Sequence, residues 1–209
     1  MPRSLSTQEI SKVLTHARTT LHTGSFGQKR DVLAVTLGLL GLRIGEIVQL
    51  NRTDLRTGTD GRHFLHVRTL KGGLQRLVPI ADGLFDHLRA VRTYSHAKPL
   101  LQVNGGGRTN TRNLRRSWDK MRELIGLDHA RFHDLRHTAA MQAWEKSGHN
   151  LFVVSALLGH RKIENTRHYL ATVGAIEKAV IEFDLGPVRT ASQPSHSWLV
   201  DDDGSEITV

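Results

Sequence analysis

The stretch "FHDLRHT", Phe132–Thr138, contains HDLRH, which differs by one methylene from the HExxH signature of zinc proteases. Histidines four residues apart on a helix can share a metal ion, and His129 adds an imidazole one turn earlier. Asp134, however, is one carbon shorter than the glutamate that such a protease uses as its base, and no third ligand motif follows. The sequence therefore predicts no metal here. His133 and His137 could instead cap a helix, pack in the core or bind another group.

Local signals on both sides of this stretch predict a mainly helical protein. A helix is expected from Ala130 to Ser147, and "LFVVSALL" after it is bounded by Asn150 and Gly159, a good N-cap and a good helix terminator. Upstream, "SLSTQEISKVLTHA", "KRDVLAVTLGLLG" and "TNTRNLRRSWDKMRELIG" have helical character. Two alternating runs, "HFLHVR" and "LQRLVPI", flank the tip "TLKGG" and predict an antiparallel hairpin. We therefore expect an α+β fold, mainly α with a small antiparallel β-sheet.

Composition narrows the classes of function. The chain of 209 residues has no cysteine, so it contains no disulfide and no thiolate metal site. No apolar run approaches membrane-spanning length and no signal peptide opens the chain, so we expect no membrane association and a cytoplasmic location. The net charge is +9, although the segment after Leu185 is acidic. The positive surplus lies on residues 1–185, which favours a polyanionic partner such as double-stranded DNA over a merely soluble surface.

One predicted helix carries a candidate surface for that partner. In "TNTRNLRRSWDKMRELIG", the apolar residues Leu114, Trp118, Met121 and Ile125 form one stripe. The basic residues of this helix lie mainly off the stripe, where they could simply be solvated or could follow a phosphate backbone. The candidate DNA contacts, on this helix and beyond it, are Arg108, Arg112, Arg115, Arg116, Lys120 and Arg161.

The motifs around HDLRH form an ordered set. Arg43 begins a helix in "GLRIGEIVQL", Lys71 lies at the hairpin tip, His160 follows the helix-ending Gly159, and Tyr169 comes nine residues later. Together with His133 and Arg136, this order of Arg, Lys, His-x-x-Arg, His and Tyr resembles the catalytic domain of the tyrosine recombinases, the phage integrase and Xer group. The resemblance covers about residues 5–183.

The resemblance implies a site-specific recombinase or integrase that cleaves and rejoins DNA through a 3′-phosphotyrosyl intermediate, with neither metal nor ATP. It implies that five residues surround a DNA phosphate and that Tyr169 is the nucleophile, while Glu46 supports the site. Guanidinium groups suit a phosphate because their fork binds two oxygens at once. An ammonium group can protonate the leaving oxygen. The residues around the phosphate are Arg43, Lys71, His133, Arg136 and His160.

Two other functions fit the same residues. A type IB topoisomerase uses a similar constellation and would relax supercoiled DNA without a specific site. A catalytically silent DNA-binding accessory module is the alternative outside enzymes, but all six positions are intact, and such a module could tolerate their loss.

The sequence also suggests an organisation. Residues 1–185 are expected to form the catalytic domain and residues 186–209, rich in serine and acid, a disordered tail. Because the resemblance begins almost at Met1, no N-terminal core-binding domain is expected, and a separate DNA-binding subunit could clamp the DNA. Ile176, Val180 and Phe183 form a narrow apolar stripe. This C-terminal helix could pack on its own domain, but the resemblance favours a homo-oligomer that assembles through it on DNA.

Overall fold

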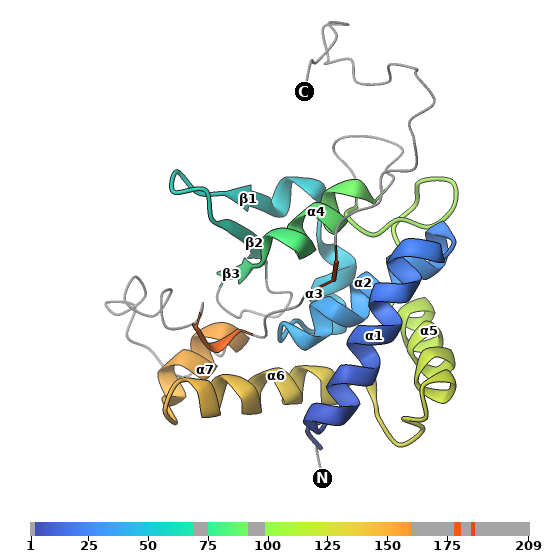
Figure 1. Cartoon of the computed structure of the whole chain (residues 1–209). Helices are drawn as coiled ribbons and strands as arrows, with labels where there is room; N and C mark the ends of the chain where they lie inside the picture. The colour runs from blue at the N-terminus through green and yellow to red at the C-terminus, as the bar shows by residue number, and fades with distance from the viewer. Residues whose placement is uncertain (1–2, 69–74, 92–98, 160–177, 181–184, 187–209) are drawn as a thin grey trace, which may run out of the picture.

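Helices dominate the computed structural model, which describes residues 3–68, 75–91, 99–159, 178–180 and 185–186 (Figure 1). The fold is mainly α with a small antiparallel sheet, as predicted, and the sheet has three strands, one more than the predicted hairpin. The helices are α1 (Thr7–Thr23), α2 (Phe26–Leu39), α3 (Ile44–Gln49), the 3-10 helix η1 (Arg52–Asp54), α4 (Asp82–Ala90), α5 (Thr111–Leu124), α6 (Phe132–Lys146) and α7 (Leu151–Leu158). The strands are β1 (Leu55–Thr57), β2 (His63–Val67) and β3 (Arg76–Ile80).

Helix α2 is the centre of the helical body. Every residue from Val32 to Leu39 is buried, because α2 packs against α1, α3, α5 and α6. A helix that is apolar all round has no solvent face and must lie inside a protein. The chain leaves α2 at Gly41 and turns directly into α3. Gly41 has a φ of +89°, which glycine adopts without steric cost. This turn brings Arg43 to the start of α3, as predicted.

The predicted hairpin is present as β2 and β3, which pair antiparallel with Leu65 opposite Val78. Two further elements were not anticipated. Strand β1 adds to the outer edge of β2, with Leu55 opposite Leu65. Helix α4 follows β3 directly, and its Phe85 ring stacks on His63 of β2 at 3.6 Å between ring centroids. Figure 1 shows the sheet and α4 on one side of the molecule and α6 along the opposite side.

Helix ends follow the local sequence signals. The Ser6 hydroxyl accepts from the Glu9 N–H at 3.3 Å and the Glu9 carboxylate accepts from the Ser6 N–H at 2.7 Å, which forms a capping box at the start of α1. The Asn150 side chain caps α7, and Gly159 ends that helix with a φ of +66°. Both signals act within one turn of the chain, which is why the sequence alone was enough to predict them.

The described residues near the C-terminus bear on the predicted apolar stripe. Ala179 and Val180 are buried with 1% and 9% of their surface exposed, and the Lys146 ammonium of α6 donates to the Val180 carbonyl at 3.1 Å. This part of the stripe therefore packs on its own domain. The predicted assembly of protomers through the C-terminal helix is not tested by these contacts and stays a prediction. Ile176 and Phe183 lie outside the described residues.

Within the described ranges, no helix is both long and apolar enough to cross a membrane.

Candidate functional site

Arg43 and Glu46, two of the predicted site residues, contact each other at the start of α3. The Arg43 N–H donates to Glu46 Oε2 at 2.8 Å, so this carboxylate caps the helix, and Arg43 Nη1 donates to Oε1 at 3.1 Å. Glu46 is buried, whereas 45% of the Arg43 side chain is exposed. The buried carboxylate thus holds one side of a guanidinium group whose other side faces outward.

Arg136, the arginine of HDLRH, reaches the same carboxylate from α6. Its Nη1 lies 3.7 Å from Glu46 Oε2 and donates to the Gly41 carbonyl, while its Nη2 donates to the Leu158 carbonyl at 2.8 Å. Arg136 is buried, so these contacts replace the water that its charge would otherwise bind. One guanidinium group therefore connects the turn after α2 with the last residue of α7.

Arg76, which the sequence analysis missed, completes the cluster. It is the first residue of β3, and its Nη1 and Nη2 donate to Glu46 Oε1 and Oε2 at 3.1 and 2.9 Å. Only 2% of the residue is exposed. A signal was present in the sequence, because residues two apart on a strand share a face. In "RLVPI", Arg76 shares its face with Val78 and Ile80, and an arginine in such an apolar row needs a buried partner.

The cluster carries more positive than negative charge. Burial, together with the neighbouring charges of Arg43 and Arg76, lowers the pKa of Arg136 to about 9, although Glu46 opposes this shift. Burial raises the pKa of Glu46, but the hydrogen bonds and charge of Arg76, with the Arg43 N–H and the charge of Arg136, outweigh it, so the net shift is downward. Three guanidinium groups share one carboxylate, and a bound anion would relieve the excess.

His133 and Asp134 begin α6. Asp134 is buried, and its Oδ2 accepts the Arg131 N–H at 2.8 Å, so the aspartate of HDLRH caps its own helix. His133 is exposed and precedes Arg136 by three residues, which places both on neighbouring parts of one helical surface. Among the described residues, no group of three or more His, Cys, Asp or Glu side chains could hold a metal ion.

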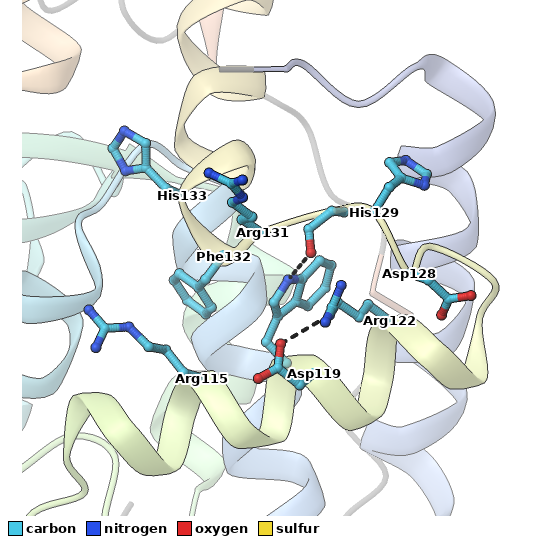
Figure 2. Close-up of a pocket in the computed structure, with 10 residues that line it drawn as sticks. Arg115, Asp119, Arg122, Asp128, His129, Arg131, Phe132 and His133 are labelled. Carbon is cyan, nitrogen blue, oxygen red and sulfur yellow. Dashed lines mark hydrogen bonds and ion pairs between the residues drawn. The ribbon is translucent and has the colours of Figure 1, made fainter. Parts of the chain in front are cut away.

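His133 also lines a hollow of about 520 Å³ between α5 and the start of α6 (Figure 2). Arg115 of α5 lines it as well, as do Trp118 and Ala130, and the Trp118 indole N–H donates to the Ala130 carbonyl at 3.0 Å. The predicted histidine and one of the predicted DNA contacts therefore share one surface depression.

The other predicted DNA contacts differ in their surroundings. Helix α5 buries Leu114, Trp118 and Met121, and its basic residues Arg112, Arg115, Arg116 and Lys120 are exposed on the remaining surface. Arg108 is engaged within the protein: its Nη1 donates to the Val48 carbonyl at 2.6 Å and its Nη2 to Asn51 Oδ1 at 2.7 Å. Its guanidinium group holds the end of α3, so its role as a DNA contact stays a prediction.

Four predicted site residues lie outside the described residues: Lys71, His160, Arg161 and Tyr169. Their neighbours in sequence are described. Arg68 and Arg76 lie on either side of Lys71, and Leu158, which accepts a hydrogen bond from Arg136, precedes His160 by two positions.

Comparison with known proteins finds a family model and curated relatives that agree with one another. A family model described as "Phage integrase family" matches residues 3–173. Tyrosine recombinase XerC of Rhodospirillum centenum is 31% identical over 176 residues, covering 81% of this chain and 50% of the relative. Tyrosine recombinase XerC of Chlamydia pneumoniae is 33% identical over 137 residues, covering 62% of this chain and 42% of the relative. The chain thus spans about half the length of the curated relatives it matches.

Solved structures share the fold. XerH site-specific recombinase bound to difH substrate, in a pre-cleavage complex, aligns with a TM-score of 0.63 at 20% identity over 85% of this chain and 50% of that chain. The lambda integrase catalytic core aligns with a TM-score of 0.57 at 19% identity over 78% of this chain and 95% of that chain.

Proposed function

The chain belongs to the phage integrase family, and from that premise we propose that it is a site-specific DNA recombinase that cleaves and rejoins strands through a 3′-phosphotyrosyl intermediate. We propose further that residues 1–185 form the catalytic domain, that residues 186–209 form a disordered tail, and that the reaction needs neither metal nor ATP.

The observation that carries this proposal is the cluster around Glu46. Arg43 and Arg136 each present a planar guanidinium group to the same buried carboxylate, and Arg76 adds a third. One carboxylate leaves this cluster with a positive excess, and guanidinium forks match the oxygens of a phosphodiester. Charge that develops on the nonbridging oxygens in the transition state would be stabilised by donors already held in place.

In the proposed reaction, the Tyr169 oxygen attacks the phosphorus while the bond from phosphorus to the 5′ oxygen breaks. Lys71 gives a proton to that leaving oxygen, which departs as a 5′ hydroxyl. Arg43 and Arg136 hold the nonbridging oxygens, and His133 and His160 add directional donors. The phosphotyrosine preserves the energy of the broken phosphodiester, so a second 5′ hydroxyl can attack it and reseal the strand.

Double-stranded DNA is the proposed partner. The exposed basic face of α5, composed of Arg112, Arg115, Arg116 and Lys120, would follow its phosphate backbone, with Arg161 and Arg108 as further candidates. Lambda integrase has been solved as a dimer bound to a core site and as a tetramer bound to a Holliday junction. We propose that this chain also forms a homo-oligomer on DNA, helped by the residues of its C-terminal helix other than Val180. A separate DNA-binding subunit could assist.

Covalent trapping tests the proposal directly. A DNA substrate carrying a nick opposite the cleavage site should yield a protein–DNA adduct in the presence of EDTA, detected by denaturing electrophoresis. The chain has two tyrosines, so Tyr94→Phe is the matched control and should form the adduct, whereas Tyr169→Phe should not. An adduct that survives Tyr169→Phe removes this tyrosine from the nucleophile's role.

A plasmid assay separates this function from that of a type IB topoisomerase. Recombination should need a specific site on each partner, whereas site-independent relaxation of supercoiled DNA would favour the topoisomerase.

A further inference from the structure

Arg76 is a buried cation to which the proposed chemistry assigns no task. It lies on β3, directly opposite Val67 of β2, and shares its strand face with Val78 and Ile80. All three of these apolar residues are buried. A guanidinium group in such surroundings loses its water, and that loss is tolerated only where other polar groups replace the water. The contacts of Arg76 therefore indicate what it is for.

Its principal contact is bidentate. Two nitrogens of Arg76 meet the two oxygens of Glu46 in parallel, at 3.1 and 2.9 Å. This geometry fixes both the position and the plane of the carboxylate. The same two oxygens hold Arg43, through its Nη1 at 3.1 Å and its N–H at 2.8 Å, and Oε2 lies 3.7 Å from Arg136. The carboxylate that Arg76 orients therefore contacts both arginines that are proposed to bind the phosphate, Arg43 and Arg136.

Arg76 also contacts the end of α7. A Cβ placed on Gly159 would lie 2.8 Å from Arg76 Nη1, so the guanidinium group packs directly on the glycine backbone. The φ of +66° at Gly159 independently disfavours a side chain there. Hairpin strand β3, helix α3 and the residue before His160 thus meet at one side chain. Within the described part of the chain, Arg76 Nε has no hydrogen-bond partner, so the fork toward Glu46 is its main polar attachment.

We infer that Arg76 is a positioning residue: by fixing the Glu46 carboxylate it sets where Arg43 and Arg136 bind the DNA phosphate, and it ties β3 and α7 to that point. The inference rests on the proposed strand-transfer function. A misplacement of about 1 Å in a reacting geometry can slow a reaction about 100-fold, while binding over a whole interface changes little. Lysine keeps the charge of Arg76 but has no fork, so it would leave the carboxylate free to turn.

The test compares Arg76→Lys with Arg68→Lys. Arg68 also donates to a buried carboxylate, Asp54, but this pair holds η1 and not α3, so it is a matched control. Three quantities are measured on the full chain: the single-turnover rate of adduct formation, the DNA dissociation constant and the melting temperature. We expect Arg76→Lys to slow adduct formation about 100-fold with a dissociation constant within about threefold of wild type. Arg68→Lys should lower only the melting temperature.

A double-mutant cycle with Glu46→Gln separates positioning from other roles. If Arg76 acts through Glu46, the double variant should be about as slow as the slower single variant, because residues that act as one unit are not additive. Multiplying effects, or a wild-type rate for Arg76→Lys, would overturn the inference. If Arg76→Lys does not fold, Glu46→Gln weakens the same fork and must slow adduct formation on its own. Failure of both variants to fold makes the pair a folding element and also overturns the inference.

The two proposals fail in different ways. If the wild type forms no adduct, the strand-transfer function itself is lost. If the wild type forms the adduct and the Arg76 variant forms it equally fast, only the positioning role is lost.

Discussion

Arg136 has a structural role and, in the proposed reaction, also binds the DNA phosphate. Its donors already bind two main-chain carbonyls, at Gly41 and Leu158, so the side chain is held before any DNA arrives. Groups that are fixed in advance do not have to reorganise during the reaction, which is why they stabilise a transition state effectively. The neighbouring Arg43 and Arg76 add positive charge beside this guanidinium, and a phosphate would compensate that excess.

Arg136→Ala should therefore reduce the rate of adduct formation about 100-fold to 1,000-fold, the range seen when one oxyanion donor is removed, and weaken DNA binding much less. Single-turnover cleavage and fluorescence anisotropy on the same substrate measure the two effects. His137→Ala is the control on the same helix, because this half-buried histidine is assigned no role in the reaction. An equal loss of rate and affinity would place Arg136 in general DNA binding.

The contacts of Asp134 bear on the zinc interpretation of HDLRH. It accepts the Arg131 N–H, so Asp134→Ala should cost about 1 kcal/mol of the free energy of unfolding, as expected for a lost helix cap. Urea denaturation measures this cost. Adduct formation by the wild type should persist in EDTA, and elemental analysis should find no stoichiometric zinc. Zinc that is lost together with activity would reverse this assignment.

At the residue scale, contacts between site residues were easier to foresee within one helix than between distant segments. Arg43 and Glu46, which the family resemblance assigned to one site, are three residues apart on one helix and contact each other. Arg136 joins them from a distant helix, which the family resemblance implied and spacing alone could not. Arg76 was missed because its partner lies 30 residues away along the chain, although its place in an apolar strand row was a usable signal.

At the scale of elements, helix α5 couples the core to the proposed DNA surface. Its Trp118 is almost wholly buried, while Arg115 and Arg116 lie on the exposed face. The helix can therefore lose surface charge without losing packing. We expect Arg115→Gln with Arg116→Gln to weaken DNA binding at all sequences and to reduce the slope of log K against log salt by about 1 for each phosphate that the variant no longer neutralises.

Anisotropy titrations at several salt concentrations measure that slope. Arg122→Gln is a suitable control on the same helix, because Arg122 pairs with Asp119 at 3.0 Å. An unchanged slope in the double variant would mean that the face is only solvated.

Elements also differ in how far the sequence could predict them. The limits of α1 and α7 were visible because their caps, Ser6 and Asn150, act within a turn of the chain. Strand β1 has three residues and exists only because it pairs with β2, so its cause lies outside its own sequence. Helix α4 depends similarly on the packing of Phe85 against His63.

At the scale of the molecule, the chain returns to its own body after the segment that contains the proposed nucleophile. Val180 is held by Lys146 of α6, and Leu185 is fully buried. Val180→Asp should therefore destabilise the free monomer by about 2 kcal/mol or more, because it places a carboxylate in an apolar core. Lys178→Asp introduces the same group at an exposed neighbour and is the control. Equal melting temperatures for the two variants would contradict this packing.

Residues Leu185 and Gly186 also contact the body of the protein, at His87 of α4, and we expect the stability from this contact to depend on pH. His87 of α4 contacts the Gly186 carbonyl through its Nε2 at 3.1 Å. Burial lowers the pKa of His87 below its ordinary value of 6.5; bonds to the Gly186 and Leu185 carbonyls and the charge of Asp86 oppose this shift, and His22 of α1 adds to it. In the folded protein His87 therefore stays neutral at pH values where the unfolded chain binds a proton. Stability from this group is complete well above pH 6.5 and falls as the pH drops through and below that value.

Urea denaturation at a series of pH values between about 8 and 5 tests this linkage. The wild type should lose stability toward the acid end, and His87→Gln, whose side chain can still donate to the Gly186 carbonyl but does not titrate, should lose less. Burial lowers the pKa of His16 on α1 as well, so part of the slope should remain in that variant and become smaller in the double variant with His16→Gln. A slope that His87→Gln leaves unchanged would mean that docking of Leu185 and Gly186 on α4 does not depend on this histidine's charge.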